Sequence, residues 1–122
     1  MDTSTLLHII CQLIVGLGIL NVWLLRSQQA TSYRGGASKT LQEEFAAYGL
    51  PKLVFYIVGA LKISAAIALL AGILLPGLVQ PAATILIILM IGAIVMHFKV
   101  KDAPIKFVPA CIVLMLSLTL AA

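Results

Sequence analysis

Four long apolar runs most constrain what this chain can become. They cover residues 6–25, 53–75, 78–97 and 104–121 and use most of the 122 residues. Apolar runs of about 18 residues or more can cross the hydrocarbon core of a bilayer as a helix, whereas runs of about 10 to 14 residues usually cannot. The composition agrees, because only 10% of the residues are charged, against roughly a quarter in soluble proteins. We therefore predict an all-α membrane protein with a single transmembrane domain, residues 1–122.

The first run has two interpretations, a retained span or a cleaved signal peptide. A signal peptide needs a positively charged start and a short apolar region. This chain starts MDTSTLLHII, with Asp2 and no Lys or Arg, and the apolar run that follows is longer than such a region. We expect a retained span.

The links between the runs predict how the helices pack. The turn PGLVQP and the link KVKDAPIK are short, so successive helices must be antiparallel neighbours, which predicts an up-down four-helix transmembrane bundle. The first link begins SQQATSYRGGASK, whose Gly and Ser content predicts a flexible loop. After it, Ser38 followed by Leu41, Phe45 and Tyr48 at helical spacing predicts a short amphipathic surface helix, which Gly49 would end.

The distribution of basic residues predicts how the chain is threaded. Lys and Arg near span ends favour the cytoplasmic side. The first link and the third, KVKDAPIK, which reaches residue 106 and so includes the start of the fourth run, carry seven of the eight basic residues, while the two termini and the middle turn carry none. We expect both termini outside the cytoplasm, in a bacterial inner membrane. Since threading accounts for these charges, they give no reason to expect nucleic acid as a partner. The seven are Arg26, Arg34, Lys39, Lys52, Lys99, Lys101 and Lys106.

The eighth basic residue, Lys62, lies near the middle of the second run. A lysine at the centre of a membrane helix costs about 2.5 to 3.5 kcal/mol on insertion scales, and ionisable residues at such depth are candidates for function. Two interpretations without a functional role compete for Lys62: its side chain reaches back toward water, or it makes a structural hydrogen bond. No acid lies within a run, so a counter-charge would come from Glu44 or Asp102 in the links, or from a ligand, a lipid phosphate or another subunit.

Helical spacing suggests which side chains lie near Lys62. One face of the second run contains Lys62, and one face of the third contains His97 near its inner end. With Asn21 from the first run and Tyr56, these faces are expected to converge on a small pocket in the cytoplasmic half. The candidate ligand-binding residues are Lys62, His97, Asn21, Tyr56 and Asp102. For His97 an interfacial position, and for Asn21 a hydrogen bond between helices, are the competing interpretations.

Motifs for covalent cofactors, metals and dinucleotides are missing from the sequence. Cys11 and Cys111 lie in different runs, without a CxxC motif or a zinc-ligand spacing. No iron–sulfur motif or dinucleotide fingerprint is present either. We expect no metal and no covalently bound cofactor, and any electrons used here would come from elsewhere.

Three stretches of the chain resemble the DoxX-like family of small membrane proteins. They are FAAYGLPKLVFYIVGALKISAAIALLAGILLP, MIGAIVMHFKVKD and PACIVLML, and the resemblance covers roughly residues 10–120. The matching features are Gly49-x-Pro51, Gly59 followed by a charged residue three positions on, and Gly92-Ala93 leading to His97 and an acid, Asp102. Many members of the family have Glu where this chain has Lys62, so a carboxylate's role there would not carry over.

The resemblance implies a four-span bundle and several possible functions. Members include a small subunit of a thiosulfate:quinone oxidoreductase and proteins linked to membrane redox complexes. One hypothesis is therefore a redox-linked membrane subunit that binds a quinone and works with a partner protein. A second is a non-catalytic accessory, assembly or lipid-contacting module in the lipid bilayer, with a homo-oligomer as one option, and a third is a small-molecule transporter. Whether the protein is an enzyme stays open, because fold does not determine function.

Overall fold

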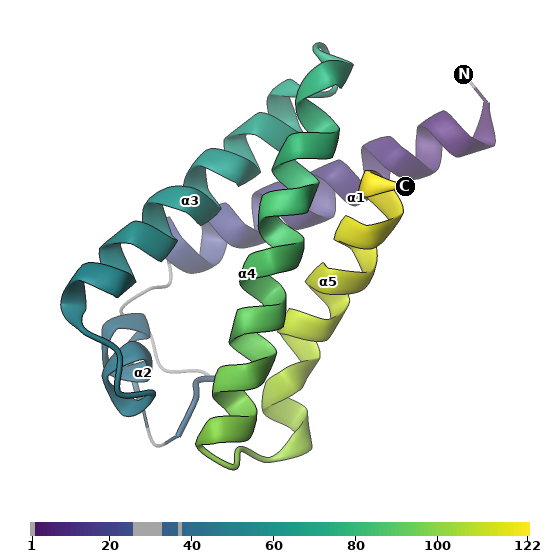
Figure 1. The fold of residues 1–122 in the computed structure, drawn as a ribbon. Helices are drawn as coiled ribbons and strands as arrows, with labels where there is room; N and C mark the ends of the chain where they lie inside the picture. The colour runs from purple at the N-terminus through teal and green to yellow at the C-terminus, as the bar shows by residue number, and fades with distance from the viewer. Residues whose placement is uncertain (1, 26–32, 37) are drawn as a thin grey trace.

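Four long helices form the protein in the computed structural model, which describes residues 2–25, 33–36 and 38–122 (Figure 1). They are α1 (Thr3–Leu20), α3 (Lys52–Ala71), α4 (Val79–Lys99) and α5 (Val108–Ala121), joined by the short helix α2 (Leu41–Ala47). A π-helical turn, Asn21–Leu25, extends α1, and 3₁₀ turns at Pro76–Leu78 and Pro104–Phe107 lead into α4 and α5. All four long helices, with their adjoining turns, are long and apolar enough to cross a membrane. The predicted fold class is confirmed.

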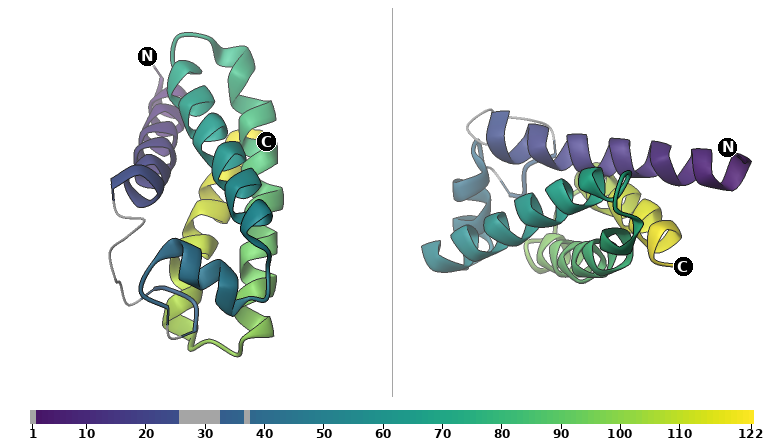
Figure 2. Two further views of the ribbon diagram at one scale, coloured as in Figure 1. Left: turned by 90° about the vertical axis from the view of Figure 1, so that its left-hand side faces the viewer. Right: turned by 90° about the horizontal axis from the view of Figure 1, so that it is seen from above.

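The four long helices pack as an up-down bundle. Helix α1 packs against α3 and α5, and α4 packs against α3 and α5. The two termini and the α3–α4 turn lie toward one end of the bundle, and α2 with the α4–α5 turn lies at the other (Figures 1 and 2). The first end is hereafter the terminal end, and the second is the α2 end.

Small residues let α1 approach α3 closely. A side chain at Gly16 would place its Cβ 2.8 Å from Leu70 Cγ and 3.2 Å from the Ala66 carbonyl oxygen. Gln12 lies at the same contact, where its Nε2 donates to the Leu69 carbonyl oxygen over 2.9 Å, and it is 4% exposed. Inside a membrane, close backbone packing and such hydrogen bonds hold helices together, because lipid is as apolar as the helix surfaces.

The second span ends earlier than its apolar run. The run was predicted as a span to Leu75, but α3 ends at Ala71 and the chain turns through residues 72–74. Pro76 has no N–H to donate, so a helix cannot continue through it with all its hydrogen bonds. In the third span the helix instead continues past the predicted end at residue 97, to Lys99.

The predicted amphipathic helix is present, although its start differs. Its N-cap is Thr40, not Ser38, and Thr40 Oγ1 accepts the Glu43 N–H over 3.1 Å. Glu43 Oε2 in turn accepts the Lys39 N–H over 2.8 Å, which gives the helix start two side-chain bonds. Gly49 ends the segment with a φ of 78°, as predicted from its freedom to adopt a left-handed conformation.

The buried face of α2 closes the α2 end of the bundle. Leu41, Phe45 and Tyr48 are buried against it. The first link was predicted to be a flexible loop. Its residues 26–32 and 37 lie outside the described residues, but Arg34 and Gly35 are buried, with Arg34 only 6% exposed.

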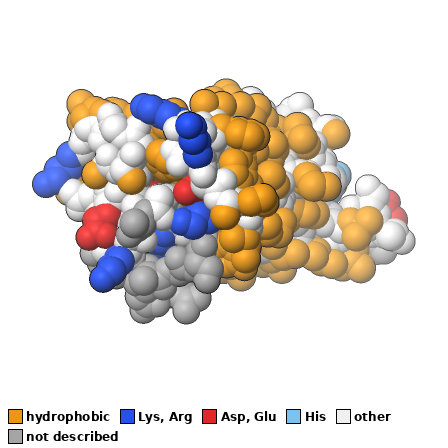
Figure 3. Space-filling view, turned by 90° about the horizontal axis from the view of Figure 1, so that it is seen from below, with side chains coloured by type: hydrophobic (Ala, Val, Ile, Leu, Met, Phe, Trp, Pro, Cys, Tyr) orange, Lys and Arg blue, Asp and Glu red, His pale blue; other side chains and the backbone are white. Residues whose placement is uncertain are grey.

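The outer surface matches a protein that spans a membrane. In Figure 3 apolar side chains dominate the middle and right of the view, and most of the charged side chains gather on the left. Large apolar residues on every long helix are exposed, among them Leu17, Ile67, Ile88 and Met115. Lipid tails, not water, suit such a surface. The chain is a multi-pass membrane protein whose long helices contact the lipid bilayer.

Candidate functional site

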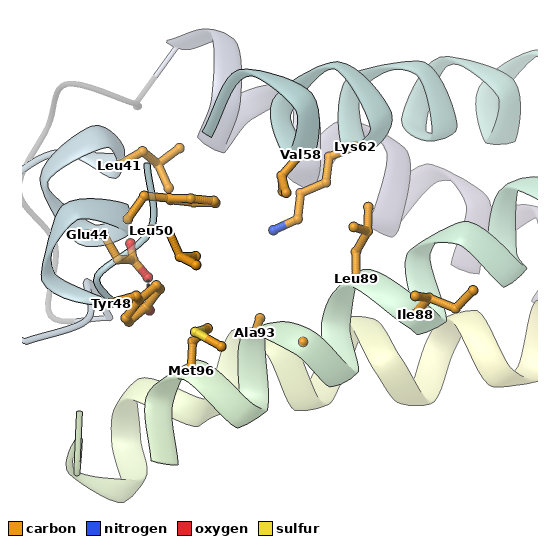
Figure 4. A pocket seen from close by; sticks show the side chains of 12 residues that line it. Leu41, Glu44, Tyr48, Leu50, Val58, Lys62, Ile88, Leu89, Ala93 and Met96 are labelled. Carbon is orange, nitrogen blue, oxygen red and sulfur yellow. Dashed lines mark hydrogen bonds between the residues drawn. The ribbon is translucent and has the colours of Figure 1, made fainter. Parts of the chain in front are cut away.

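A pocket of about 210 Å³ lies between α2, α3 and α4, at the α2 end of the bundle. Figure 4 shows it in close view, with α3 above, α4 below and the α2 segment at one side. On the α4 side, Ile88 and Gly92 line the pocket and are also exposed on the outer surface, so the pocket opens sideways between α3 and α4. Its walls are mainly apolar and include Leu41, Leu50, Val58, Leu89, Ala93 and Met96.

The ammonium group of Lys62 points into this pocket (Figure 4). Its Nζ also lies 5.3 Å from the ring centroid of Trp23, a cation–π contact. All four acidic residues of the chain are in its described part, and none forms an ion pair with Lys62. The pocket therefore presents an ammonium donor that forms no ion pair with an acid of the chain.

Trp23 reaches Lys62 because Gly59 leaves room for its indole ring. A Cβ at position 59 would lie 2.7 Å from Trp23 Cζ3. The indole stacks on Phe55 at 5.4 Å between ring centroids and meets the edge of Phe45 at 5.9 Å. The glycine three positions before Lys62, a feature of the resemblance, thus admits the aromatic ring that contacts this lysine.

Glu44 is the one acid among the residues that line the pocket, and its carboxylate already has two partners, Tyr48 and Arg34. Its Oε1 accepts a hydrogen bond from the Tyr48 hydroxyl over 2.6 Å, and its Oε2 lies 3.8 Å from Arg34 Nη1. Burial, together with this hydrogen bond to the carboxylate, raises the pKa of Tyr48 far above its usual value. Tyr48 therefore stays protonated and remains a donor to Glu44 at neutral pH.

Asp102 is the centre of a polar cluster behind the pocket. Its Oδ2 lies 2.6 Å from His97 Nδ1, and its Oδ1 accepts the Gly36 N–H over 2.8 Å. Lys106 Nζ lies 3.8 Å from Oδ1 and donates to the Gly36 carbonyl oxygen. Burial by itself would raise the pKa of Asp102, but the hydrogen bonds from His97 and Gly36 and the charges of His97 and Lys106 outweigh it and lower that pKa. Asp102 is therefore ionised at neutral pH.

The Asp102 cluster fastens the first link and α2 to the α4–α5 turn. Gly36 is bound from that turn on both its N–H and its carbonyl. Lys99 Nζ donates to the Tyr48 carbonyl oxygen over 2.8 Å, and the His97 ring meets the Tyr48 ring edge-on at 5.8 Å between centroids. Tyr48 and Glu44 line the pocket, so the cluster positions its α2 wall.

The structure brings together some of the five candidate residues and separates others. Lys62 lines the pocket, and His97 and Asp102 form a pair behind it. The expectation that Asn21 and Tyr56 line the same pocket is wrong: Asn21 is exposed in the π-helical turn, and Tyr56 is 58% exposed with its ring against Phe55. The expected convergence of His97 on the pocket is also wrong, because its ring is 4% exposed and packs between Tyr48 and Phe107. Whether any of the five binds a ligand stays a prediction.

Sequence reasoning did not assign Trp23, Arg34 and Tyr48 to this region. Aromatic residues at span ends usually mark the membrane interface, so Trp23 gave no signal for a contact with Lys62. Arg34 lies in a Gly-rich stretch that is typical of a loop. Among the residues that the structure describes, no group of three His, Cys, Asp or Glu side chains is placed to hold a metal ion.

Comparison with known proteins gives one family match. The DoxX-like family matches residues 30–120 of the chain. Neither the curated proteins nor the solved structures give a match. The matched range includes α2, the Asp102 cluster and every residue that lines the pocket.

Proposed function

The chain belongs to the DoxX-like family, and from its pocket we propose that it is a small redox-linked membrane subunit that binds the head group of an isoprenoid quinone. The observation that carries the proposal is the Lys62 ammonium in a mainly apolar pocket. A quinone head group is an apolar ring with carbonyl oxygens. Such a ring suits these walls, and a carbonyl oxygen can accept a hydrogen bond from Lys62.

The size and the opening of the pocket suit a ligand that consists of one ring and a long tail. Pockets for whole drug-sized ligands have volumes of about 300 to 1,000 Å³, whereas this one has about 210 Å³. It therefore suits a single head group. The opening beside Ile88 and Gly92 lets an isoprenoid tail leave between α3 and α4 into the lipid.

In this proposal the electrons come from a partner protein. The sequence contains no CxxC motif and no dinucleotide fingerprint that would supply a redox centre of its own. The proposed orientation has both termini outside the cytoplasm of a bacterial cell, as the basic links favour. The pocket then lies in the cytoplasmic half of the inner membrane.

The single tryptophan offers a direct test of quinone binding. Trp23 is the only Trp of the chain, and its ring contacts Lys62. Titrating decylubiquinone into the full chain in lipid nanodiscs should quench Trp23 fluorescence saturably, because a bound ring lies near the indole. Lys62→Met should weaken this binding about tenfold, the effect of losing a charge-assisted hydrogen bond of about 1.4 kcal/mol.

The matched control is Lys52→Met, which removes an exposed lysine from the start of the same helix. It should bind decylubiquinone as the wild type does. Bound quinone should also be recovered by mass spectrometry from gently purified wild-type protein. Quenching that never saturates, or that is equal in all three proteins, would reject the proposal and favour the alternative, a non-catalytic accessory or lipid-contacting module.

A further inference from the structure

The acidic residues of this chain all bind other groups, which leaves Lys62 without an ion-pair partner. The sequence has four of them. Asp2 accepts the Thr5 N–H at the start of α1, and Glu43 accepts the Lys39 N–H at the start of α2. The other two are paired, Glu44 with Arg34 and Asp102 with His97 and Lys106.

The cation–π contact with Trp23 offsets only part of what an unpaired ammonium costs within a membrane. Such a contact contributes about 0.5 to 2 kcal/mol, against an insertion cost of about 2.5 to 3.5 kcal/mol for lysine at a helix centre. An anion next to Lys62 would offset the rest of this insertion cost. Glu44 faces the same pocket, but its carboxylate contacts Arg34 and the Tyr48 hydroxyl and forms no ion pair with Lys62.

We propose that the pocket is also a binding site for a long-chain carboxylate, whose head group pairs with Lys62 and whose acyl chain leaves between α3 and α4. The apolar lining and the sideways opening beside Ile88 and Gly92 suit the chain. The volume of about 210 Å³ suits a carboxylate better than a phospholipid head group with its glycerol and second chain. The inference concerns the same pocket as the quinone proposal, but it rests on charge and does not require that quinone binds.

The test measures binding of radiolabelled oleate to the full chain in phosphatidylcholine nanodiscs. Wild-type protein should bind oleate saturably and methyl oleate, which has the same chain without the charge, at least about tenfold more weakly, because the charge-assisted bond is lost. Lys62→Met should weaken oleate binding by a similar factor, Lys62→Arg should retain it, and Lys52→Met should leave it unchanged.

Glu44→Gln separates a charge effect from a structural one. This variant keeps a side chain that can accept the Tyr48 hydrogen bond but removes a negative charge from the pocket wall. It should bind oleate about two- to fivefold more tightly, since one repulsion is gone, whereas damage to the pocket would weaken binding. Each variant is first checked for wild-type helical content and melting temperature.

The outcomes also separate this inference from the quinone proposal. Oleate binding that depends on Lys62, without saturable quenching by decylubiquinone, would support the carboxylate site and reject the quinone site. The converse pattern would reject the carboxylate site alone. Equal binding of oleate and methyl oleate would reject it as well, and so would binding of dioleoyl phosphatidic acid with the same dependence on Lys62 and higher affinity than oleate, because the ligand would then be a phospholipid.

Discussion

Replacing Asp102 with alanine is expected to destabilise the protein by about 3 kcal/mol, because removal of one partner from a buried charge cluster leaves the others uncompensated. The carboxylate is the common acceptor for His97, the Gly36 N–H and Lys106. Without it, the Gly36 N–H loses its acceptor in the α4–α5 turn, and the buried His97 ring loses its hydrogen bond to the carboxylate. The free energy of unfolding, measured in mild detergent with increasing amounts of denaturing detergent, gives the difference.

The control for this prediction is Glu43→Ala. It also removes an acid whose carboxylate accepts a backbone N–H, but Glu43 is exposed at the start of α2. Loss of such a capping bond typically costs about 1 kcal/mol. If Asp102→Ala costs no more than Glu43→Ala, the Asp102 cluster does not hold the α2 end together.

The stabilities of the wild type and of Asp102→Ala should depend differently on pH. In the folded protein the pKa of Asp102 is lower than in the unfolded chain, where a carboxyl of this type has a pKa of about 3.9. The stability that it contributes is therefore fully present above about pH 4 and is lost as the pH falls through the folded-state pKa. The difference between wild type and Asp102→Ala should shrink below about pH 4, and a difference that instead grew there would contradict an ionised Asp102.

Substituting valine for Gly16 is expected to separate α1 from α3. A Cβ at this position would lie 2.8 Å from Leu70 and 3.2 Å from the Ala66 carbonyl oxygen, and the backbone of Ala66 cannot move without moving α3. Overpacking of this kind costs about 1 to 3 kcal/mol. The hydrogen bond from Gln12 to the Leu69 carbonyl spans the same helix pair and should lengthen or break, which adds to the loss.

Gly18 provides a control two residues further along α1. A Cβ there would meet nothing within 4 Å, so Gly18→Val adds the same side chain on the outer surface of the same helix. Its melting temperature should stay within about 2 °C of the wild type, whereas Gly16→Val should melt several degrees lower, as expected for 1 kcal/mol or more in a chain of this size. Equal melting temperatures for the two variants would show that the α1–α3 contact is not tight.

The spans were predictable because a bilayer leaves few alternatives. A chain in lipid must satisfy its backbone hydrogen bonds internally, so run length and apolar content alone identify the helices. Lys62 was found for the same reason, since a single charge in a long apolar run is conspicuous. Its neighbour Trp23 was not, because the contact depends on how α1 lies against Gly59, and no local pattern in the sequence encodes that placement.

The α2 end was harder to predict than the spans. The Gly-rich stretch around Arg34 has the composition of a loop, yet Gly35 is buried because it leaves room for the Tyr48 ring, and Gly36 is bound by Asp102. The two residues of the first contact are 13 positions apart in the chain, and those of the second are 66 positions apart. Helical periodicity does not reach so far. His97 and Asp102 were singled out as candidates, but no pattern along the chain indicated that they bind each other and do not line the pocket.

The position of Gly36 has a consequence for how the protein is made. Its two binding partners, Asp102 and Lys106, follow it by 66 and 70 residues. A ribosome therefore completes α1, α2 and α3 long before the groups that fasten the 33–36 segment exist, and chains fold in the order of their synthesis. The α2 wall of the pocket can be fastened only after the α4–α5 turn has been made, so a nascent chain that stops at the end of α4 lacks both groups that hold Gly36 in place.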